Sequence, residues 1–175
     1  KHLDWTTTYK VVSRSIFCKG GPIAIQMKFI ISMKMEGEAD THALAKMKVR
    51  DLSISTDEPV ERGGTNTAPS PTETMLASLI GCTNVITQKI AAKHRIDVLG
   101  LKIGVTAQLD RRGVSLGNEI KVPFPEIDLN IELTTCGDDA DVAVLQMDLS
   151  KYCPISKILR ESGTKVNENW TINRL

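Results

Sequence analysis

Four cysteines, Cys18, Cys82, Cys136 and Cys153, are the side chains in this sequence best suited to covalent chemistry. They form no C-x-x-C pair, and they are too sparse to build a disulfide scaffold in a chain of 175 residues. A free cysteine can act as a nucleophile through its thiolate and can be oxidised reversibly. Their spacing therefore favours reactive or buried thiols, and Cys18 and Cys136 lie in stretches where an incidental cysteine is the simpler interpretation.

Cys82 lies on an apolar stripe of a predicted helix, together with Met75, Leu79, Ile86 and Ile90. Steps of three and four residues place these side chains along one side of a helix. Free cysteine is among the most often buried residue types, so a purely structural Cys82 is the ordinary interpretation of such a stripe. A reactive thiol and a core residue both stay open on this pattern alone.

Cys153 immediately precedes Pro154, and the residue before a proline is driven out of helical conformation. Cys153 should therefore cap the helix that Pro154 opens. Unpaired N–H groups and the positive end of the helix dipole favour a thiolate at such a position. The sequence predicts an ionisable thiol here, with an accidental cap between two short helices as the alternative.

Other polar candidates give no metal or cofactor site. His94 follows Cys82 by twelve residues, which in one helix is roughly 18 Å along the axis and roughly 120° around it, so the two cannot touch. The acidic pairs at 57–58 and 138–139 are typical of helix caps and turns. The other two histidines have no ligand spacing, so we expect neither a metal nor a bound cofactor.

Alternating apolar residues predict strands in the first third of the chain. The alternation is regular over 25–35, and after a turn at 37–40 it resumes at 45–49 and runs on through Leu52 and Ile54. These segments predict an antiparallel meander. The stretch 5–16 alternates less regularly and is predicted as an edge strand or arm.

A long helix follows at 70–94. Ser70 as cap, Pro71 in the first turn and Glu73 three residues after the cap make a capping box. The helix is apolar or small almost all round, which predicts burial on most sides. Gly81 in its middle indicates close approach of another backbone, which we expect to be a second helix.

The rest of the chain completes an α+β order with no internal repeat or linker. We expect one domain, 1–175, made of an arm (1–24), a β-meander and loop (25–69), the central helix (70–94) and a C-terminal part (95–175). That last part should contain strands at 99–109 and 127–133, helices at 138–149 and 154–163, and a strand at 166–172.

Composition excludes several classes of partner. The apolar fraction is 41%, the charged fraction 25% and the net charge +1, with no basic stripe that would bind nucleic acid. No apolar run approaches the roughly 18 residues of a membrane helix, and no signal peptide begins the sequence. We therefore expect a cytoplasmic protein without membrane or nucleic-acid partners, although a start at Lys1 leaves processing of a longer precursor open.

Two motifs resemble the signature of the OsmC/Ohr family (osmotically induced protein C and organic hydroperoxide resistance). The first is Thr65-Asn66 with Pro71-Thr72-Glu73 and the run from Leu76 to Cys82; the second runs from Cys153 to Lys157. Their order and the 71 residues between the two cysteines fit that family. The resemblance implies antiparallel sheets wrapped around a long central buried helix in an intertwined homodimer.

The resemblance also implies a thiol-dependent peroxidase that reduces organic hydroperoxides to alcohols, an antioxidant activity. Cys82 would attack the peroxide and become a sulfenic acid, and Cys153 would convert it to a Cys82–Cys153 disulfide. An external dithiol would then reduce the disulfide, so no cofactor is implied. Two alternatives on the same fold are a protein that binds a small ligand or senses redox state without turnover, and a purely structural stress-associated dimer.

Active relatives ionise the peroxidatic thiol with an arginine held by a glutamate, and this sequence departs there. The glutamate position falls at Thr72, next to Glu73, and the arginine position falls near 57–58, where no cation stands. Arg62 and Arg50 are the substitutes, so the predicted site is Cys82, Cys153, Glu73 and Arg62. In a dimer, the loop 61–71 of one subunit would supply the cation for the other's cysteine. The run Asp57-Glu58-Pro59, Gly63-Gly64 and Pro69 to Glu73 is closest to the OsmC-like subgroup.

Overall fold

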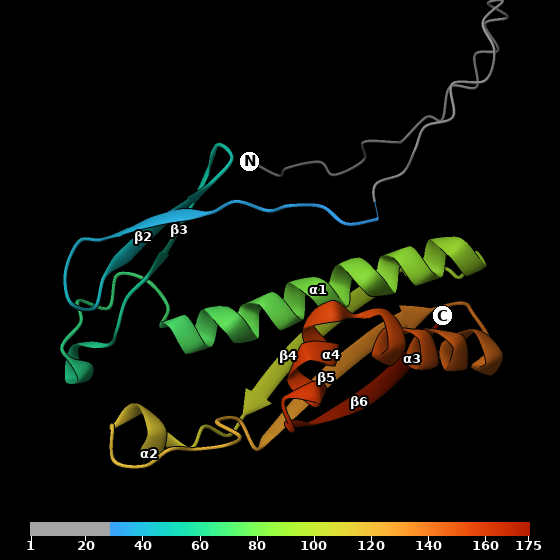
Figure 1. Cartoon of the computed structure of the whole chain (residues 1–175). Coiled ribbons are helices and arrows are strands. Elements are labelled where there is room, and N and C mark those ends of the chain that lie inside the picture. The colour runs from blue at the N-terminus through green and yellow to red at the C-terminus, as the bar shows by residue number, and fades with distance from the viewer. Residues whose placement is uncertain (1–28) are drawn as a thin grey trace, which may run out of the picture. The chain divides into compact units, whose positions relative to one another are not determined.

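The computed structural model describes residues 29–175 (Figure 1). The expected edge strand at 5–16, the arm at 1–24, Cys18 and the first part of the strand expected at 25–35 lie outside these residues. The chain separates into two units, Lys1–Lys34 and Met35–Leu175. The second unit contains all the helices and strands described below, so the prediction of a single domain across the whole sequence stays a prediction.

The first sheet is an antiparallel meander, as predicted, but its strands begin and end elsewhere. The strands are β1 (Glu36–Ala39), β2 (Ala45–Val49) and β3 (Leu52–Thr56), in the order β1-β2-β3. The expected strand at 25–35 is wrong over residues 29–35, which are not strand. A segment with alternating apolar residues forms a strand only where another strand pairs with it. Here β2 pairs with residues 36–39, and Gly37 lies opposite Met47.

The second expected strand of that meander is two strands. The chain reverses after Val49, so that Val49 pairs with Leu52 across a turn at Arg50 and Asp51. Arg50 has a φ of 57°, in the left-handed region. The apolar positions step by two through Ala45, Met47 and Val49 but by three from Val49 to Leu52. This break in the alternation marks the reversal, and the sequence prediction overlooked it.

Helix α1 (Pro71–His94) begins at the predicted capping box. The N–H of Glu73 donates to Ser70 Oγ at 3.3 Å, and the N–H of Ser70 donates to Glu73 Oε2 at 2.7 Å. The helix ends at Arg95, whose φ is 60° and whose N–H donates to the Ala91 carbonyl. These reciprocal bonds satisfy the first N–H groups of the helix and fix where it starts.

Only one side of α1 is buried within the chain, contrary to the expectation of burial on most sides. The buried residues share the face toward α3 and the second sheet; they are Leu79, Thr83, Thr87, Ile90 and Ala91. Val85 is 48% exposed, and a Cβ added at Gly81 would meet nothing within 4 Å. The backbone expected to cross at Gly81 is therefore not part of residues 29–175.

By length and composition, α1 is also the one helix in the described part of the chain that could cross a membrane. This differs from the expectation that no run is apolar enough. A single helix of this kind is weak evidence for a membrane span, since the core helix of a protein in water passes the same test.

The second sheet is mixed, whereas the sequence predicted antiparallel sheets. Its strands are β4 (Gly100–Ala107), β5 (Glu126–Thr135) and β6 (Lys165–Arg174), in the order β4-β5-β6. Strands β4 and β5 are antiparallel, while β5 and β6 are parallel. Helices α3 (Asp139–Tyr152) and α4 (Pro154–Glu161) form the crossover that a parallel connection requires. The short helix α2 (Arg111–Val114), in the β4–β5 connection, was not predicted.

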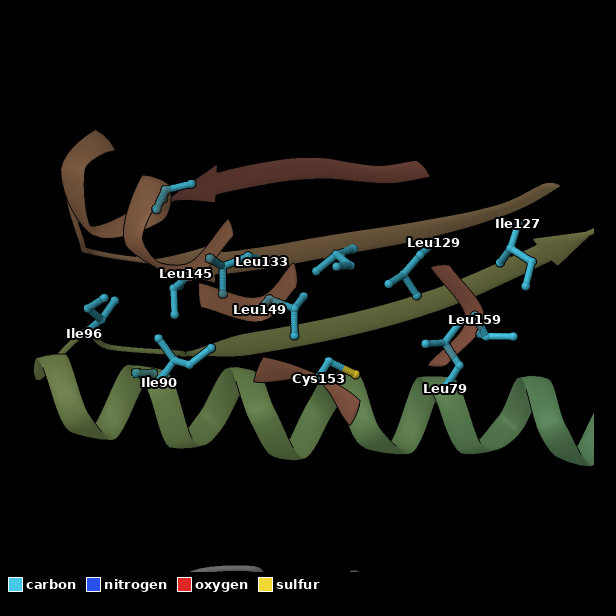
Figure 2. Packing of buried hydrophobic residues seen from close by; sticks show 13 residues of the cluster. Leu79, Ile90, Ile96, Ile127, Leu129, Leu133, Leu145, Leu149, Cys153 and Leu159 are labelled. Carbon is cyan, nitrogen blue, oxygen red and sulfur yellow. The ribbon is translucent and has the colours of Figure 1, made fainter. Parts of the chain in front are cut away.

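The core lies between the second sheet and the helices α1, α3 and α4 (Figure 2). As predicted, every second residue of β5 faces inward, and Ile127, Leu129, Ile131 and Leu133 are almost fully buried. Cys153 is part of this cluster and lies next to α1 in Figure 2. The core thus extends to the bend between α3 and α4 and holds that bend against α1.

Candidate thiol site

Cys82 and Cys153 lie side by side, as the predicted pair requires. Their Sγ atoms are 3.3 Å apart although the residues are 71 positions apart in sequence. Cys82 comes from the middle of α1, and Cys153 occupies the bend between α3 and α4. Both are free thiols, and Cys82 is only partly buried.

Backbone bonds on both sides fix the position of Cys153. Its N–H donates to the Leu149 carbonyl at 2.9 Å and ends α3, while its own carbonyl accepts from the N–H of Lys157 at 3.0 Å and begins α4. The residue itself is extended, with φ −71° and ψ 107°, as the proline after it demands. The predicted cap position is therefore confirmed.

The ionisation predicted for Cys153 is wrong. The pKa of the Cys153 thiol is raised to about 11: burial is the largest cause, the neighbouring Cys82 sulfur is a smaller one, and the backbone N–H groups of Ser156 and Ile155 act in the opposite direction. The side chain is 0% exposed, so desolvation of the thiolate raises the pKa by more than the N–H groups at the helix end lower it. At pH 7 about one Cys153 in 10,000 would be a thiolate.

Three buried hydroxyls accompany the thiols, and sequence reasoning missed them. The Oγ atoms of Thr83, Thr87 and Ser156 are buried and have no hydrogen-bond partner within residues 29–175. Thr83 follows Cys82 directly, and Ser156 lies in the first turn of α4, three residues after Cys153. The sequence did contain a signal, two threonines four residues apart on the side of the helix predicted to be buried. Buried hydroxyls without a partner are rare, so these two residues could have been singled out.

Glu73 is confirmed as a capping residue and does not meet Cys82 within the chain. Its carboxylate accepts from the N–H and the hydroxyl of Ser70, and these bonds, with a smaller contribution from Arg62, hold its pKa below the ordinary value. Nine residues separate Glu73 from Cys82, which is about 13.5 Å along the helix axis and on its opposite side.

Arg62 lies in the loop that precedes α1. Its Nε donates to Glu58 Oε2 at 2.5 Å, at the end of a 3-10 turn formed by Val60–Arg62. Its positive charge contributes to the lowered pKa of Glu73. The structure therefore separates the predicted site into a thiol pair in the core and an Arg62–Glu73 group at the start of α1.

Asp57 organises that loop, a role that the sequence did not indicate. Its carboxylate accepts from the N–H and the hydroxyl of both Thr65 and Thr67, and from the N–H of Glu58. These bonds hold the pKa of Asp57 well below its usual range, with the Thr65 hydroxyl as the largest cause. The loop that carries Arg62 is thus built around one buried carboxylate.

The remaining candidates take no part in the thiol site. His94 lies 3.6 Å from Asp148, at the other end of α1. Cys136 is exposed in the turn after β5. Within residues 29–175, no group of three or more His, Cys, Asp or Glu side chains is arranged to hold a metal ion.

Solved structures of low sequence identity share this fold. The OsmC-like protein from Mycoplasma pneumoniae superposes with a TM-score of 0.69 at 19% identity, over 82% of this chain and 98% of that one. The organic hydroperoxide resistance protein OsmC from Legionella pneumophila gives 0.61 at 15% identity, over 83% and 99%. OhrB of Bacillus subtilis, an organic hydroperoxide resistance protein, gives 0.52 at 20% identity, over 81% and 98%.

The family comparison matches the part of the chain that contains both cysteines. Residues 64–169 match the family described as OsmC-like protein, from the end of the Asp57 loop to β6. The search of curated proteins gave no match. Because the family match spans more than half of the sequence, the chain belongs to the OsmC-like protein family.

Proposed function

We propose that this protein is a thiol-dependent peroxidase that reduces organic hydroperoxides to alcohols. The observation that carries the proposal is the 3.3 Å contact between the sulfurs of Cys82 and Cys153. Two thiols at this distance can alternate between a dithiol and a disulfide with little movement, since a disulfide requires only about 1.3 Å of further approach. Membership of a family that includes proteins named for organic hydroperoxide resistance agrees with it.

Cys82 is the residue that takes the first step. Its thiolate attacks the distal oxygen of the hydroperoxide, the O–O bond breaks, and the alkoxide leaves as an alcohol after taking up a proton. Cys82 becomes a sulfenic acid. The assignment follows from access, because Cys82 is partly exposed while Cys153 is 0% exposed and is held as a neutral thiol by burial.

Cys153 takes the second step. Its sulfur attacks the Cys82 sulfenic acid, a disulfide forms, and the hydroxyl leaves as water with the proton that Cys153 gives up. An external dithiol returns two electrons and two protons and restores both thiols. The apolar residues beside Cys82, among them Met75, Leu79 and Ile86, favour an alkyl hydroperoxide over hydrogen peroxide.

The cation that ionises Cys82 would come from a second copy of the chain in a homodimer. Within residues 35–175, no Lys, Arg or His side chain forms a hydrogen bond with either sulfur. The exposed face of α1 at Gly81 and Val85 is open and weakly polar, as a helix–helix contact requires. The loop 61–71 of the partner would then bring an arginine such as Arg62 to Cys82.

The lack, within residues 35–175, of a cation hydrogen-bonded to the sulfurs favours one alternative. This is a protein of the same fold that binds a ligand or senses redox state without catalytic turnover of peroxide. In that case Cys82 would react once or bind an electrophile reversibly. Either function needs the thiols kept reduced, which supports a location in the cytoplasm.

Peroxide consumption distinguishes the two. The protein, with dihydrolipoamide as the reductant, should consume cumene hydroperoxide faster than hydrogen peroxide. Cys82→Ser should abolish turnover, and Cys153→Ser should let sulfenic or sulfinic acid accumulate on Cys82, as mass spectrometry would show. Cys136→Ser, which removes an exposed thiol outside the site, is the matched control. If Cys82 stays a free thiol while the peroxide persists, the protein is not a peroxidase.

A further inference from the structure

A cavity of about 530 Å³ lies away from the thiol pair, between the loop before α1 and the β4–β5 connection. Three arginines line it, with one acidic, two hydroxyl and two apolar side chains; the residues are Arg62, Arg111, Arg112, Glu58, Thr72, Ser115, Leu109 and Val114. Its volume falls within the range of about 300–1,000 Å³ that small-molecule sites occupy.

The arginines of this cavity differ in how they are paired. Arg62 is held by Glu58 through Nε, and Arg112 is held by Asp110, with Nε–Oδ1 3.0 Å and Nη2–Oδ2 2.5 Å. The side chain of Arg111 forms no hydrogen bond or ion pair with any other described residue. A guanidinium with all five N–H donors free therefore faces a cavity in which the other two are already oriented by carboxylates.

Carboxylates are present nearby but are committed to other donors. Asp110 caps α2 by accepting from the N–H of Arg112. Glu73, whose pKa is lowered in part by the charge of Arg62, accepts from Ser70. Neither lines the cavity. One guanidinium, that of Arg111, is thus available to bind an anion. The bound anion would lie beside Thr72 in the first turn of α1, where the helix dipole also favours negative charge.

We propose that this cavity binds an organic carboxylate, with Arg111 as its principal anchor. A planar guanidinium recognises a carboxylate through two parallel N–H···O bonds. Leu109 and Val114 give the cavity an apolar wall, which suits a short hydrocarbon chain better than inorganic phosphate. The cavity shares Arg62 with the proposed peroxidase site, but its anchor Arg111 and both thiols are separate. Carboxylate binding to the reduced protein is measured without peroxide, so this proposal can fail or hold independently of the peroxidase proposal.

Calorimetric titration of the reduced protein with octanoate tests the proposal. We expect one site per chain and at least a tenfold weaker affinity for Arg111→Ala, the order expected for losing a charge-assisted bidentate pair. Arg50→Ala, at the exposed β2–β3 turn, is the matched control and should bind as the unsubstituted protein does. Octanol shares the chain without the charge, and inorganic phosphate shares the charge without the chain; both should bind far more weakly.

Four results would overturn the proposal, three of them from the choice of ligand. Octanoate could fail to bind at millimolar concentration, octanol could bind as well as octanoate, or phosphate could bind as well as octanoate. Equal losses for Arg111→Ala and Arg50→Ala would also contradict it, because the effect would then be one of net charge. Circular dichroism of both variants, with Arg111→Lys as a second variant that retains the charge but not the bidentate geometry, separates loss of binding from loss of fold.

Discussion

The buried Cys153 thiol should titrate far above an ordinary cysteine. Its pKa is raised from the ordinary 9.0 to about 11, with burial as the largest cause. At pH 7 this lowers its thiolate fraction from about one in a hundred to about one in 10,000, a hundredfold loss of the nucleophilic form. Because burial is the largest cause and Cys82 a smaller one, the shift should persist when Cys82 is replaced.

The assay is the ultraviolet absorbance of thiolate, which needs no access of a reagent to the sulfur, from pH 7 to pH 11.5. It compares Cys82→Ser with the same variant in which Cys153 is also replaced by serine, so the difference reports Cys153 alone. The midpoint of that difference should lie near pH 11, and circular dichroism at each pH reports on the fold. A midpoint at or below pH 9 would refute the argument that desolvation exceeds the helix-end effect.

The same shift has a consequence for stability. The folded-state pKa is raised, so the stabilisation belongs to the protonated thiol: it is fully present below pH 9 and is lost as pH rises towards 11. Denaturant unfolding of Cys153→Ala, compared with the unsubstituted protein at pH 8 and pH 10.5, should show a smaller dependence on alkaline pH in the variant.

Three further changes test other parts of the structure. Thr83→Val replaces a buried, unpaired hydroxyl with a methyl group and should raise the free energy of unfolding by about 1 kcal/mol; a loss would mean that the hydroxyl has a partner. Asp57→Asn should lower the melting temperature by roughly 5 °C at pH 7. Because the folded-state pKa of Asp57 is lowered, its contribution is lost as pH falls below the ordinary value, so the difference should shrink in acid. Gly81→Leu meets open space within one chain, so it should leave the fold intact and abolish the proposed dimer in sedimentation; a dimer that survives would exclude that face as the interface.

Features set by neighbours in sequence could be predicted. The capping box at Ser70 and Glu73, the cap position of Cys153 and the alternation of β5 all depend on residues within one turn or one strand. The pairing of the two cysteines came from the family motifs and not from any local pattern. In the structure the two sulfurs lie 3.3 Å apart within one chain.

Features set by long-range packing could not be predicted. Alternation does not say which strand will be the neighbour, so it gave neither the start of β1 at Glu36 nor the parallel pairing of β5 with β6. The prediction of a thiolate at Cys153 was wrong for the same kind of reason. A helix end can be recognised in sequence, but the desolvation that opposes it depends on side chains brought from α1 and the second sheet.

A neutral, buried Cys153 is compatible with its proposed role because of where its sulfur lies. A thiolate fraction of about one in 10,000 would make it a poor nucleophile toward a peroxide in solution. Toward the Cys82 sulfur, at 3.3 Å, the reaction is intramolecular, and well-oriented groups of this kind reach effective molarities of about 10⁵ M or more. Proximity therefore offsets the low thiolate fraction of Cys153 in its reaction with the Cys82 sulfenic acid, but not in a reaction with peroxide in solution. In the proposed mechanism, the same burial would keep Cys153 from reacting with the substrate, leave the first attack to Cys82 and reserve Cys153 for the second.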